Sequence, residues 1–475
     1  MIRKLIRSID FPRDLHKRWI YRCIYWILIF AAFFLLSADL LVSGILTVTL
    51  LLLLDFLRTT KDGLPLIKIL LLTAFVQLIT APLLISRYFS SAYPHVTTLP
   101  LPLGDYLLYM LPAVGALYVM ILIFNIDDKI NQAFNKTTAF LDTRPGIPFI
   151  VLGIALLGFA ISFIVPPSLQ FLTYLMVGCL NIGILYFLFS SNQYKMVIIS
   201  SIVLINVIDA FYWTAYGNLF LWTILLSIYF FNKYKISMIS KICMVIGGIL
   251  VLMFLQIIKM EFRNEVWKDG IVQERGLAWD SGNIRDRFNA LRQVVVNKKG
   301  QWVTSETINK ATVDLLIRLN QGYWSNTIMS RVPEKVPHAY GRTIVDGFFA
   351  ALIPRFIWPD KPGSDMQNFN IYTGWELEHF YSNISVFSEG YINFGKIGGV
   401  IFILCYSCII CLIFSALIKF ANAKNPTLLL WIPLIFYQVV RLEADFTVAF
   451  NHMVKSSFFV CLLYALFWYV FRLRI

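Results

Sequence analysis

The sequence predicts an all-α polytopic membrane protein with about twelve transmembrane helices and one large extracytoplasmic loop that is itself largely helical. Two observations lead to this fold class. Of the 475 residues, 58% are hydrophobic and only 14% are charged, whereas a soluble domain carries about a quarter charged residues. The apolar residues also form continuous runs of about 20, the helix length that crosses a bilayer. Continuous rather than alternating apolarity favours helices over a transmembrane β-barrel.

The apolar runs divide the chain into three parts. Residues 1–258 form an N-terminal bundle of about nine helices, 259–396 form the loop, and 397–475 contain about three more helices. The strongly basic start of the chain is followed by no clear cleavage site, so the first run is expected to stay as a helix. The predicted spans are 20–38, 41–57, 66–86, 104–124, 147–165, 169–190, 196–213, 216–232, 241–258, 397–418, 427–442 and 454–471.

The short loops predict the topology. Alternate loops are rich in lysine and arginine, as cytoplasmic loops are, whereas those near Asp39, Pro166 and Tyr216 carry almost no basic residues. Both termini are therefore expected in the cytoplasm and the 259–396 loop outside it, since long loops translocate largely regardless of charge. The net charge of +14 then reflects the cytoplasmic edge of a membrane, and no nucleic-acid partner is expected.

Two helices are predicted within the loop. Ile284, Phe288, Leu291 and Val295 recur at helical spacing beside several basic residues. Such a helix either lies flat on the outer leaflet or packs on the rest of the loop. A second helix is expected to begin at Thr304 or Ser305 and to run to Gly322.

Arginine is abundant in the loop. Its planar guanidinium group matches phosphate oxygens, so an arginine cluster at a membrane surface suggests a phosphorylated ligand. Salt bridging is the alternative, for example between Asp314 and Arg318, four residues later on one helix. The nine arginines are Arg263, Arg275, Arg285, Arg287, Arg292, Arg318, Arg331, Arg342 and Arg355.

The most distinctive stretch is the proline-rich turn at 353–363, which holds Arg355 and Lys361 on a stiff backbone beside two aromatic residues. A rigid cationic turn suits a diphosphate leaving group. The segment Ser-Glu-Gly-Tyr-Ile-Asn-Phe-Gly at 388–395 follows, directly before an apolar run. Its glycines either allow close approach of a ligand or shape the start of the helix.

These two motifs resemble the oligosaccharide repeat-unit polymerases, or Wzy-type O-antigen polymerases. The likeness in architecture covers most of the chain, and the likeness in specific residues covers about 318–395. The resemblance implies a glycosyltransferase C-like fold and inverting glycosyl transfer on the outer face of the bacterial inner membrane. The product would be lipopolysaccharide O-antigen or exopolysaccharide. Undecaprenyl-diphosphate-linked glycan would be donor and acceptor, with no cofactor or metal, and a chain-length regulator is a candidate partner.

The resemblance also implies roles for individual residues. By position, Arg355 and Lys361 would contact the diphosphate. The chain departs from related ligases, which carry a His-Asn pair before the helix, because Ser382 precedes Asn383 here. Further candidates for substrate binding are Arg318, Arg331, Arg441, Tyr391 and Trp358.

Inverting transfer also needs a base that removes the proton of the acceptor hydroxyl. The candidates, in order, are Glu389, Asp209 and His379. Glu389 could instead pair with an arginine, and Asp209 could simply face water at the membrane edge.

Residues with oxygen or nitrogen ligand atoms lie two positions apart at 376–379 and 443–445, a spacing typical of metal ligands. Metal-dependent relatives carry such ligands in a long first external loop, whereas here that loop has only a few residues, so no metal is expected.

Three other functions stay open. A ligase that moves a finished glycan to a lipid core is close to a polymerase in sequence. A lipid-linked oligosaccharide transporter is less expected, because few charges fall within the apolar runs and two related halves are not evident. A membrane acyltransferase would need His338, His379 or His452 as its catalytic histidine, and none has a supporting motif.

Overall fold

The fold is described from a computed structural model of the full chain. It describes residues 15–61, 63–90, 94–124, 130–166, 169–212, 216–266, 289, 292–293, 296, 304–353, 357–358, 361, 366–375 and 383–469. Within these residues all regular secondary structure is helical, so the all-α prediction is confirmed there.

The helices follow one another along the chain with short connections, and several break or bend within one apolar run. They are α2 (Leu15–Ser37), α3 (Leu40–Thr59), α4 (Leu66–Phe75), η1 (Val76–Thr80), α5 (Ala81–Tyr88), α6 (Pro94–Thr97), α7 (Leu103–Phe124), α8 (Ile130–Asp142), α9 (Ile147–Ile161), α10 (Gln170–Phe189), α11 (Lys195–Tyr212), α12 (Gly217–Tyr234), α13 (Met238–Val266), α15 (Ser305–Leu319), α16 (Gln321–Arg331), α17 (Arg342–Leu352), α18 (Met366–Thr373), α19 (Val386–Ala423), α20 (Leu428–Phe436) and α21 (Phe446–Tyr469).

Among the described residues, seven helices are long and apolar enough to cross a membrane, or eight if the bent pair α8–α9 counts as one span. The seven are Leu40–Thr59, Leu66–Tyr88, Leu103–Phe124, Gln170–Phe189, Met238–Ile258, Val386–Ala423 and Phe446–Tyr469. The chain thus has the helices of a multi-pass membrane protein. The predicted spans at 20–38, 196–213 and 216–232 correspond to α2, α11 and α12, which fall outside this set.

One predicted span needs correction. The expected helix over 427–442 ends at Phe436, and turns occupy the residues after it. The polar side chains of Gln438 and Arg441 interrupt the apolar run there, and the nine-residue helix α20 falls outside the set of candidate spans.

The chain forms two compact units, Met1–Asp55 and Phe56–Ile475. In the first unit, α2 is followed by α3, whose start is capped by the Asp39 carboxylate. Its Oδ1 atom accepts the backbone N–H groups of Leu41 at 2.8 Å and of Val42 at 3.1 Å. Such a cap satisfies N–H groups that have no partner within the helix.

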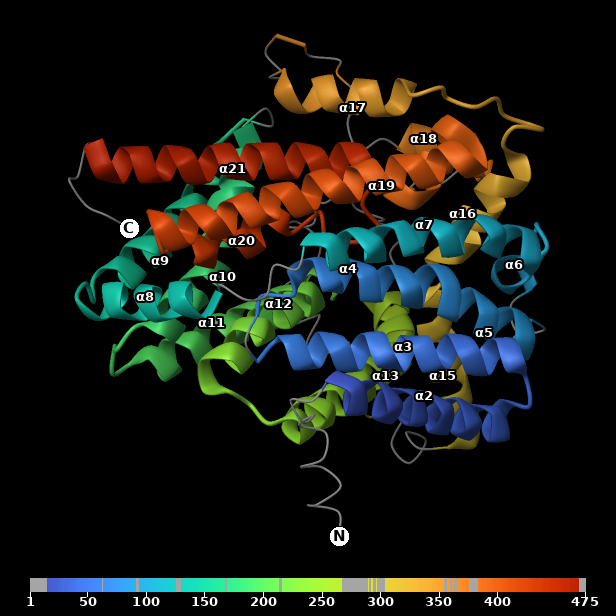
Figure 1. The fold of residues 1–475 in the computed structure, drawn as a ribbon. Helices are drawn as coiled ribbons and strands as arrows, with labels where there is room; N and C mark the ends of the chain where they lie inside the picture. The colour runs from blue at the N-terminus through green and yellow to red at the C-terminus, as the bar shows by residue number, and fades with distance from the viewer. Residues whose placement is uncertain are drawn as a thin grey trace. The chain divides into compact units, whose positions relative to one another are not determined.

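The second unit contains the other helices. Here α7 packs along α19, α9 packs on α10, and α17 packs on α21 (Figure 1). The span Leu66–Tyr88 contains the π-helical turn η1, and Tyr106 of α7 donates a hydrogen bond to the Leu78 carbonyl in that turn at 2.7 Å. The π-turn, which no sequence pattern predicted, therefore anchors α7.

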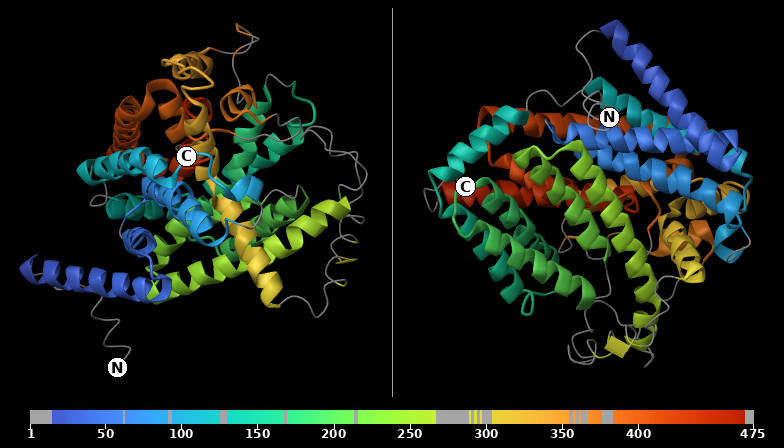
Figure 2. Two further views of the ribbon diagram at one scale, coloured as in Figure 1. Left: turned by 90° about the vertical axis from the view of Figure 1, so that its right-hand side faces the viewer. Right: turned by 90° about the horizontal axis from the view of Figure 1, so that it is seen from below.

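The helices of the loop region also belong to the second unit. As predicted, α15 begins after Thr304, whose hydroxyl accepts the Thr307 N–H at 3.1 Å, but it ends at Leu319 and α16 follows. Figure 2 shows α15 crossing α13, on which it packs. The predicted amphipathic helix over 284–295 lies, apart from single positions, outside the described residues.

The helix that follows the loop begins earlier than predicted. It starts at Val386, where Ser385 accepts the Ser388 N–H, rather than near residue 397. Gly395 interrupts it with a φ of 67°, a backbone conformation that other residues rarely adopt. This glycine therefore shapes the start of the span, and the Ser-Glu-Gly-Tyr-Ile-Asn-Phe-Gly segment forms a separate helical part before the kink.

Candidate functional site

The candidate site is centred on Glu389, where the N-terminal ends of α17, α19 and α21 meet. Glu389 is 2% exposed. Its Oε1 atom accepts a hydrogen bond from the Thr343 hydroxyl on α17 at 2.7 Å, and Oε2 accepts the Phe446 N–H on α21 at 2.7 Å. Helix N-termini carry partial positive charge and favour a carboxylate. One side chain thus joins the starts of three helices.

Asn393, one turn further along α19, strengthens this junction. Its Nδ2 atom donates to the Thr343 hydroxyl at 2.8 Å and to the Glu389 carbonyl at 2.9 Å, while its Oδ1 atom accepts the Gly341 N–H at 2.9 Å. Both Asn393 and Thr343 are buried. The polar residues of the 388–395 segment therefore hold the first turn of α17 against α19.

A second carboxylate lies beside Glu389. Asp445, 8% exposed, is close enough for its charge to act on Glu389. Its Oδ1 atom accepts the Val448 N–H at 2.7 Å and so caps α21. Tyr372 of α18 is also near: burial raises the pKa of its hydroxyl, the Arg342 guanidinium lowers it, and the Glu389 carboxylate raises it. The centre of the site is therefore acidic and buried.

Two of the predicted arginines meet at the surface near this acidic centre. Glu443 forms an ion pair through Oε1 with Arg318 at 3.7 Å and accepts a hydrogen bond through Oε2 from Arg441 at 3.3 Å. The side chains of Arg318 and Arg441 are 57% and 39% exposed. Because Glu443 and Asp445 are two residues apart, their Cα atoms lie within about 7 Å. The carboxylate that holds both arginines is thus two residues along the chain from the buried Asp445, and Arg318 pairs with Glu443 in place of the expected Asp314.

Lys361 lies at the C-terminal end of α17, and no described contact joins it to the arginine pair. It is 5% exposed, and its ammonium group donates to the carbonyls of Ala350 and Ile353 at 2.5 and 2.6 Å. It therefore caps the C-terminal end of α17, whose last carbonyls lack partners within the helix. Trp358, half-buried, is linked to it through its carbonyl, which accepts the Lys361 N–H at 3.3 Å. The predicted diphosphate contact by Lys361 stays a prediction.

Arg331, at the end of α16, lies against the backbone of Gly374. A Cβ atom at Gly374 would lie 2.5–2.7 Å from the guanidinium atoms, so a larger residue there would displace this arginine. The Nε atom of Arg331 is buried and has no hydrogen-bond partner in the described part of the chain. Close by, Tyr391 donates to the Val332 carbonyl at 3.2 Å and packs its ring on Tyr109.

The other predicted residues are not brought to this site by any described contact. Asp209 is an exposed residue of α11, whose main packing partners are α10 and α12. Arg355 and His379 lie outside the described residues, as does the rest of 376–382. Their roles stay predictions.

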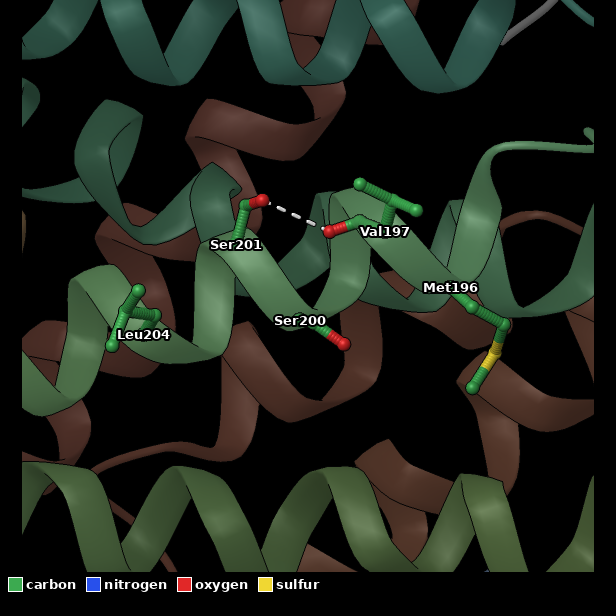
Figure 3. Close-up of a pocket in the computed structure, with 5 residues that line it drawn as sticks. All are labelled: Met196, Val197, Ser200, Ser201 and Leu204. Atoms are coloured by element: carbon green, nitrogen blue, oxygen red, sulfur yellow. Dashed lines mark hydrogen bonds between the residues drawn. The ribbon is translucent and has the colours of Figure 1, made fainter.

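An open apolar groove lies elsewhere, on α11, with a volume of about 400 Å³. Figure 3 shows the five residues that line it, Met196, Val197, Ser200, Ser201 and Leu204. The Ser201 hydroxyl bonds to the Val197 carbonyl of its own helix at 2.9 Å. Since none of these five side chains is charged, the groove does not carry the candidate site.

Sequence reasoning missed several members of the site. Asp445 could have been found, because an aspartate directly before an apolar helix is typical of an N-cap. His338 was named only as a possible acyltransferase histidine, because its partner is distant in sequence: its Nδ1 atom lies 3.1 Å from the Ile392 carbonyl, just before the kink of α19. Thr343 was missed for the same reason, whereas Glu443 and Asp445 were singled out only as a metal-like pattern.

The described residues include no group of three or more His, Cys, Asp or Glu side chains placed to hold a metal ion. Of the pattern at 443–445, Glu443 pairs with two arginines and Asp445 caps a helix. The absence of a metal stays a prediction.

A family model described as a domain of unknown function (DUF8712) matches residues 108–472. The match includes Glu389, the arginine pair and the helices that surround them. No curated protein and no solved structure matches the chain.

Proposed function

The chain belongs to the DUF8712 family, and we propose that it is a membrane-embedded glycosyltransferase that polymerises polyprenyl-diphosphate-linked oligosaccharide repeat units. The observation that carries this proposal is the exposed guanidinium pair of Arg318 and Arg441, held by Glu443 beside the buried acids Glu389 and Asp445. Paired guanidinium groups fit a diphosphate. The resemblance of the 354–362 and 388–395 motifs to repeat-unit polymerases supplies the substrate class.

In the proposed reaction, a hydroxyl oxygen of the acceptor glycan attacks the anomeric carbon of the donor. The bond from that carbon to the diphosphate oxygen breaks, the configuration inverts, and polyprenyl diphosphate leaves with the bonding electrons. Arg318 and Arg441 neutralise the charge that develops on the leaving group. Glu443 positions both guanidinium groups before the substrate arrives.

The proton of the acceptor hydroxyl must pass to a base. Glu389 was the first candidate, but both of its carboxylate oxygens already accept hydrogen bonds and it is 2% exposed. His338 is half-buried, and its Nδ1 atom lies within hydrogen-bond distance of a backbone carbonyl. Donation from Nδ1 would leave Nε2 as an acceptor in the neutral imidazole. We therefore assign the base to His338 and a positioning role to Glu389.

The finer features of the predicted architecture belong to the same proposal. They are a glycosyltransferase C-like arrangement of about twelve spans in the bacterial inner membrane, both termini in the cytoplasm, and the 259–396 loop in the periplasm. Alternation of basic and non-basic short loops supports this topology. In this topology Arg318 and Arg331 lie on the periplasmic side of the membrane, where lipid-linked repeat units are joined.

Deletion of the gene, followed by complementation with variants, tests the proposal. Loss of a polymerase leaves single repeat units on the cell surface, whereas loss of a ligase leaves long chains on the lipid carrier. Arg441→Ala is expected to cut elongation by about 100-fold while the protein stays in the membrane. Arg144→Ala, in an exposed loop elsewhere, is the matched control.

Purified chain incubated with undecaprenyl-diphosphate-linked repeat unit should form a ladder of products. Absence of a ladder with the wild-type chain, together with unchanged surface glycan in the deletion strain, would overturn the proposed function.

A further inference from the structure

A cluster of aromatic side chains lies between α16 and α18, outside the candidate membrane spans. Trp324 contacts Tyr323, Phe369 and Trp375, with ring centroids 5.1, 5.0 and 5.4 Å apart. The planes of Trp324 and Trp375 are perpendicular, at 90°, which is the edge-to-face arrangement that aromatic pairs favour. The two indole rings are thus held in fixed orientations.

Exposure differs sharply within this cluster. Phe369 is 1% and Tyr323 7% exposed, so they form its buried floor. Trp324 and Trp375 are only half-buried, although indole is among the most apolar surfaces a side chain offers. Neither α16 nor α18 belongs to the candidate spans.

A cation with an unused donor adjoins the same aromatic residues. The guanidinium of Arg331 packs on Gly374, the residue before Trp375, and its buried Nε–H has no acceptor in the described part of the chain. The turn that carries Trp375 is held by its own N–H, which donates to the Thr373 hydroxyl at 3.2 Å. The residue as a whole is half-buried, so its guanidinium is a charged donor group beside the aromatic cluster.

The cluster is tied directly to the proposed catalytic site. Ser325, next to Trp324, shares a hydrogen bond of 2.7 Å with Ser388, which is next to Glu389. Both hydroxyl groups are buried. This contact joins α16, the helix that carries Trp324, to the N-terminal part of α19.

We propose that Trp324, Trp375 and Arg331 form a subsite for a sugar ring of the acceptor glycan. One face of a hexose ring carries mainly C–H groups and packs on an indole face, while its hydroxyl or carboxylate oxygens, at the rim, accept hydrogen bonds from a guanidinium. A phosphate would engage the guanidinium but gain nothing from the indoles. This inference rests on the proposed function and names where the growing chain is held.

Such a subsite would retain the acceptor between successive transfers. A second attachment point away from the reacting end makes rebinding intramolecular and slows release of the chain. Loss of the subsite should therefore shorten the polymer more than it slows a single transfer.

The test uses the full chain in detergent micelles and two probes. One probe is the free repeat-unit oligosaccharide, released by mild acid hydrolysis from the host's surface glycan, and the other is inorganic pyrophosphate. Binding is measured by calorimetry for the wild type, Trp375→Ala and Trp375→Phe. Tyr194→Ala, which changes an exposed aromatic residue in the turn before α11, is the control. Wild-type-like thermal unfolding of each variant shows that it has folded.

We expect Trp375→Ala to weaken oligosaccharide binding at least about tenfold and to leave pyrophosphate binding unchanged. Trp375→Phe should recover most of the affinity, and Tyr194→Ala should match the wild type. Equal oligosaccharide affinity in Trp375→Ala and wild type would overturn the subsite, as would an equal loss for both probes.

A single-transfer assay separates this inference from the proposed function. If the oligosaccharide binds in a Trp375-dependent way but the wild-type chain joins no repeat units, the subsite stands and the polymerase proposal fails. If the wild type makes long chains and Trp375→Ala makes chains of the same length with the same acceptor KM, the subsite alone fails.

Discussion

The Glu389 carboxylate accepts the backbone N–H of Phe446 at 2.7 Å, so a side chain in the first turn of α19 satisfies the first N–H group of α21. That N–H group has no acceptor within its own helix. The other oxygen of the same carboxylate accepts the Thr343 hydroxyl from α17. Three helices that are far apart in sequence are therefore joined through one buried side chain.

This junction predicts the effect of truncating Glu389. Glu389→Ala leaves the Thr343 hydroxyl and the Phe446 N–H buried without partners, which should cost about 2–4 kcal/mol of folding stability. Glu389→Gln keeps one oxygen that can accept one of these two hydrogen bonds, so it should cost less than Glu389→Ala. Thermal unfolding of the detergent-solubilised chain measures both. Equal stability of Glu389→Ala and wild type would contradict the role assigned to this carboxylate.

The kink of α19 predicts a glycine requirement. Gly395 has a φ of 67°, and a Cβ atom there would lie 3.6 Å from the His338 ring, an ordinary contact. The cost of Gly395→Ala is therefore backbone strain, about 1–2 kcal/mol, rather than a clash. Gly115→Ala in α7, where a Cβ would meet nothing within 4 Å, is the control and should be neutral or stabilising. Comparable unfolding temperatures for the two variants would argue against the kink.

Close packing of α17 on α21 predicts a coupled pair. A Cβ atom at Gly347 would lie 2.3 Å from the Thr447 hydroxyl and 3.2 Å from its Cα and Cβ. Gly347→Ala should destabilise the chain by about 1–3 kcal/mol. Thr447→Ala in the same chain should restore part of this loss, because it removes the nearest atom while the 3.2 Å contacts remain. A double-mutant cycle measures the coupling, and additive effects would indicate that the helices do not pack in this way.

Much of this arrangement was predictable from local sequence, and the rest was not. Apolar runs located most helices, and Thr304 marked the start of α15, because both signals depend only on neighbouring residues. The meeting of Arg318 with Glu443 depends on how α15 packs against a distant turn, which no local pattern encodes. The role of Lys361 was also not predictable from local sequence. The residue type indicated a cation, but its partners, the carbonyls of Ala350 and Ile353, depend on how the chain folds back on α17.

The shared carboxylate of Glu443 predicts non-additive effects on anion binding. Arg318→Ala and Arg441→Ala should each weaken the binding of inorganic pyrophosphate about tenfold. Both guanidinium groups pair with Glu443. When one arginine is removed, Glu443 pairs more strongly with the remaining guanidinium group and competes with pyrophosphate for it. The double variant should then lose less than the product of the two single effects. Titration at fixed ionic strength measures this, and unchanged affinity in both single variants would remove the arginine pair from the site.

Lys361 allows a direct comparison between the role that the sequence predicts and the one that its contacts support. Lys361→Met keeps the length of the side chain but removes the ammonium group that donates to the Ala350 and Ile353 carbonyls. A capping role predicts a loss of about 1–3 kcal/mol in folding stability with unchanged affinity for inorganic pyrophosphate. A diphosphate-binding role predicts the opposite, a loss of affinity in a chain of nearly normal stability. Thermal unfolding and pyrophosphate titration of the same preparation distinguish them. We expect the capping result because Lys361 is only 5% exposed and its ammonium group donates to the end of α17.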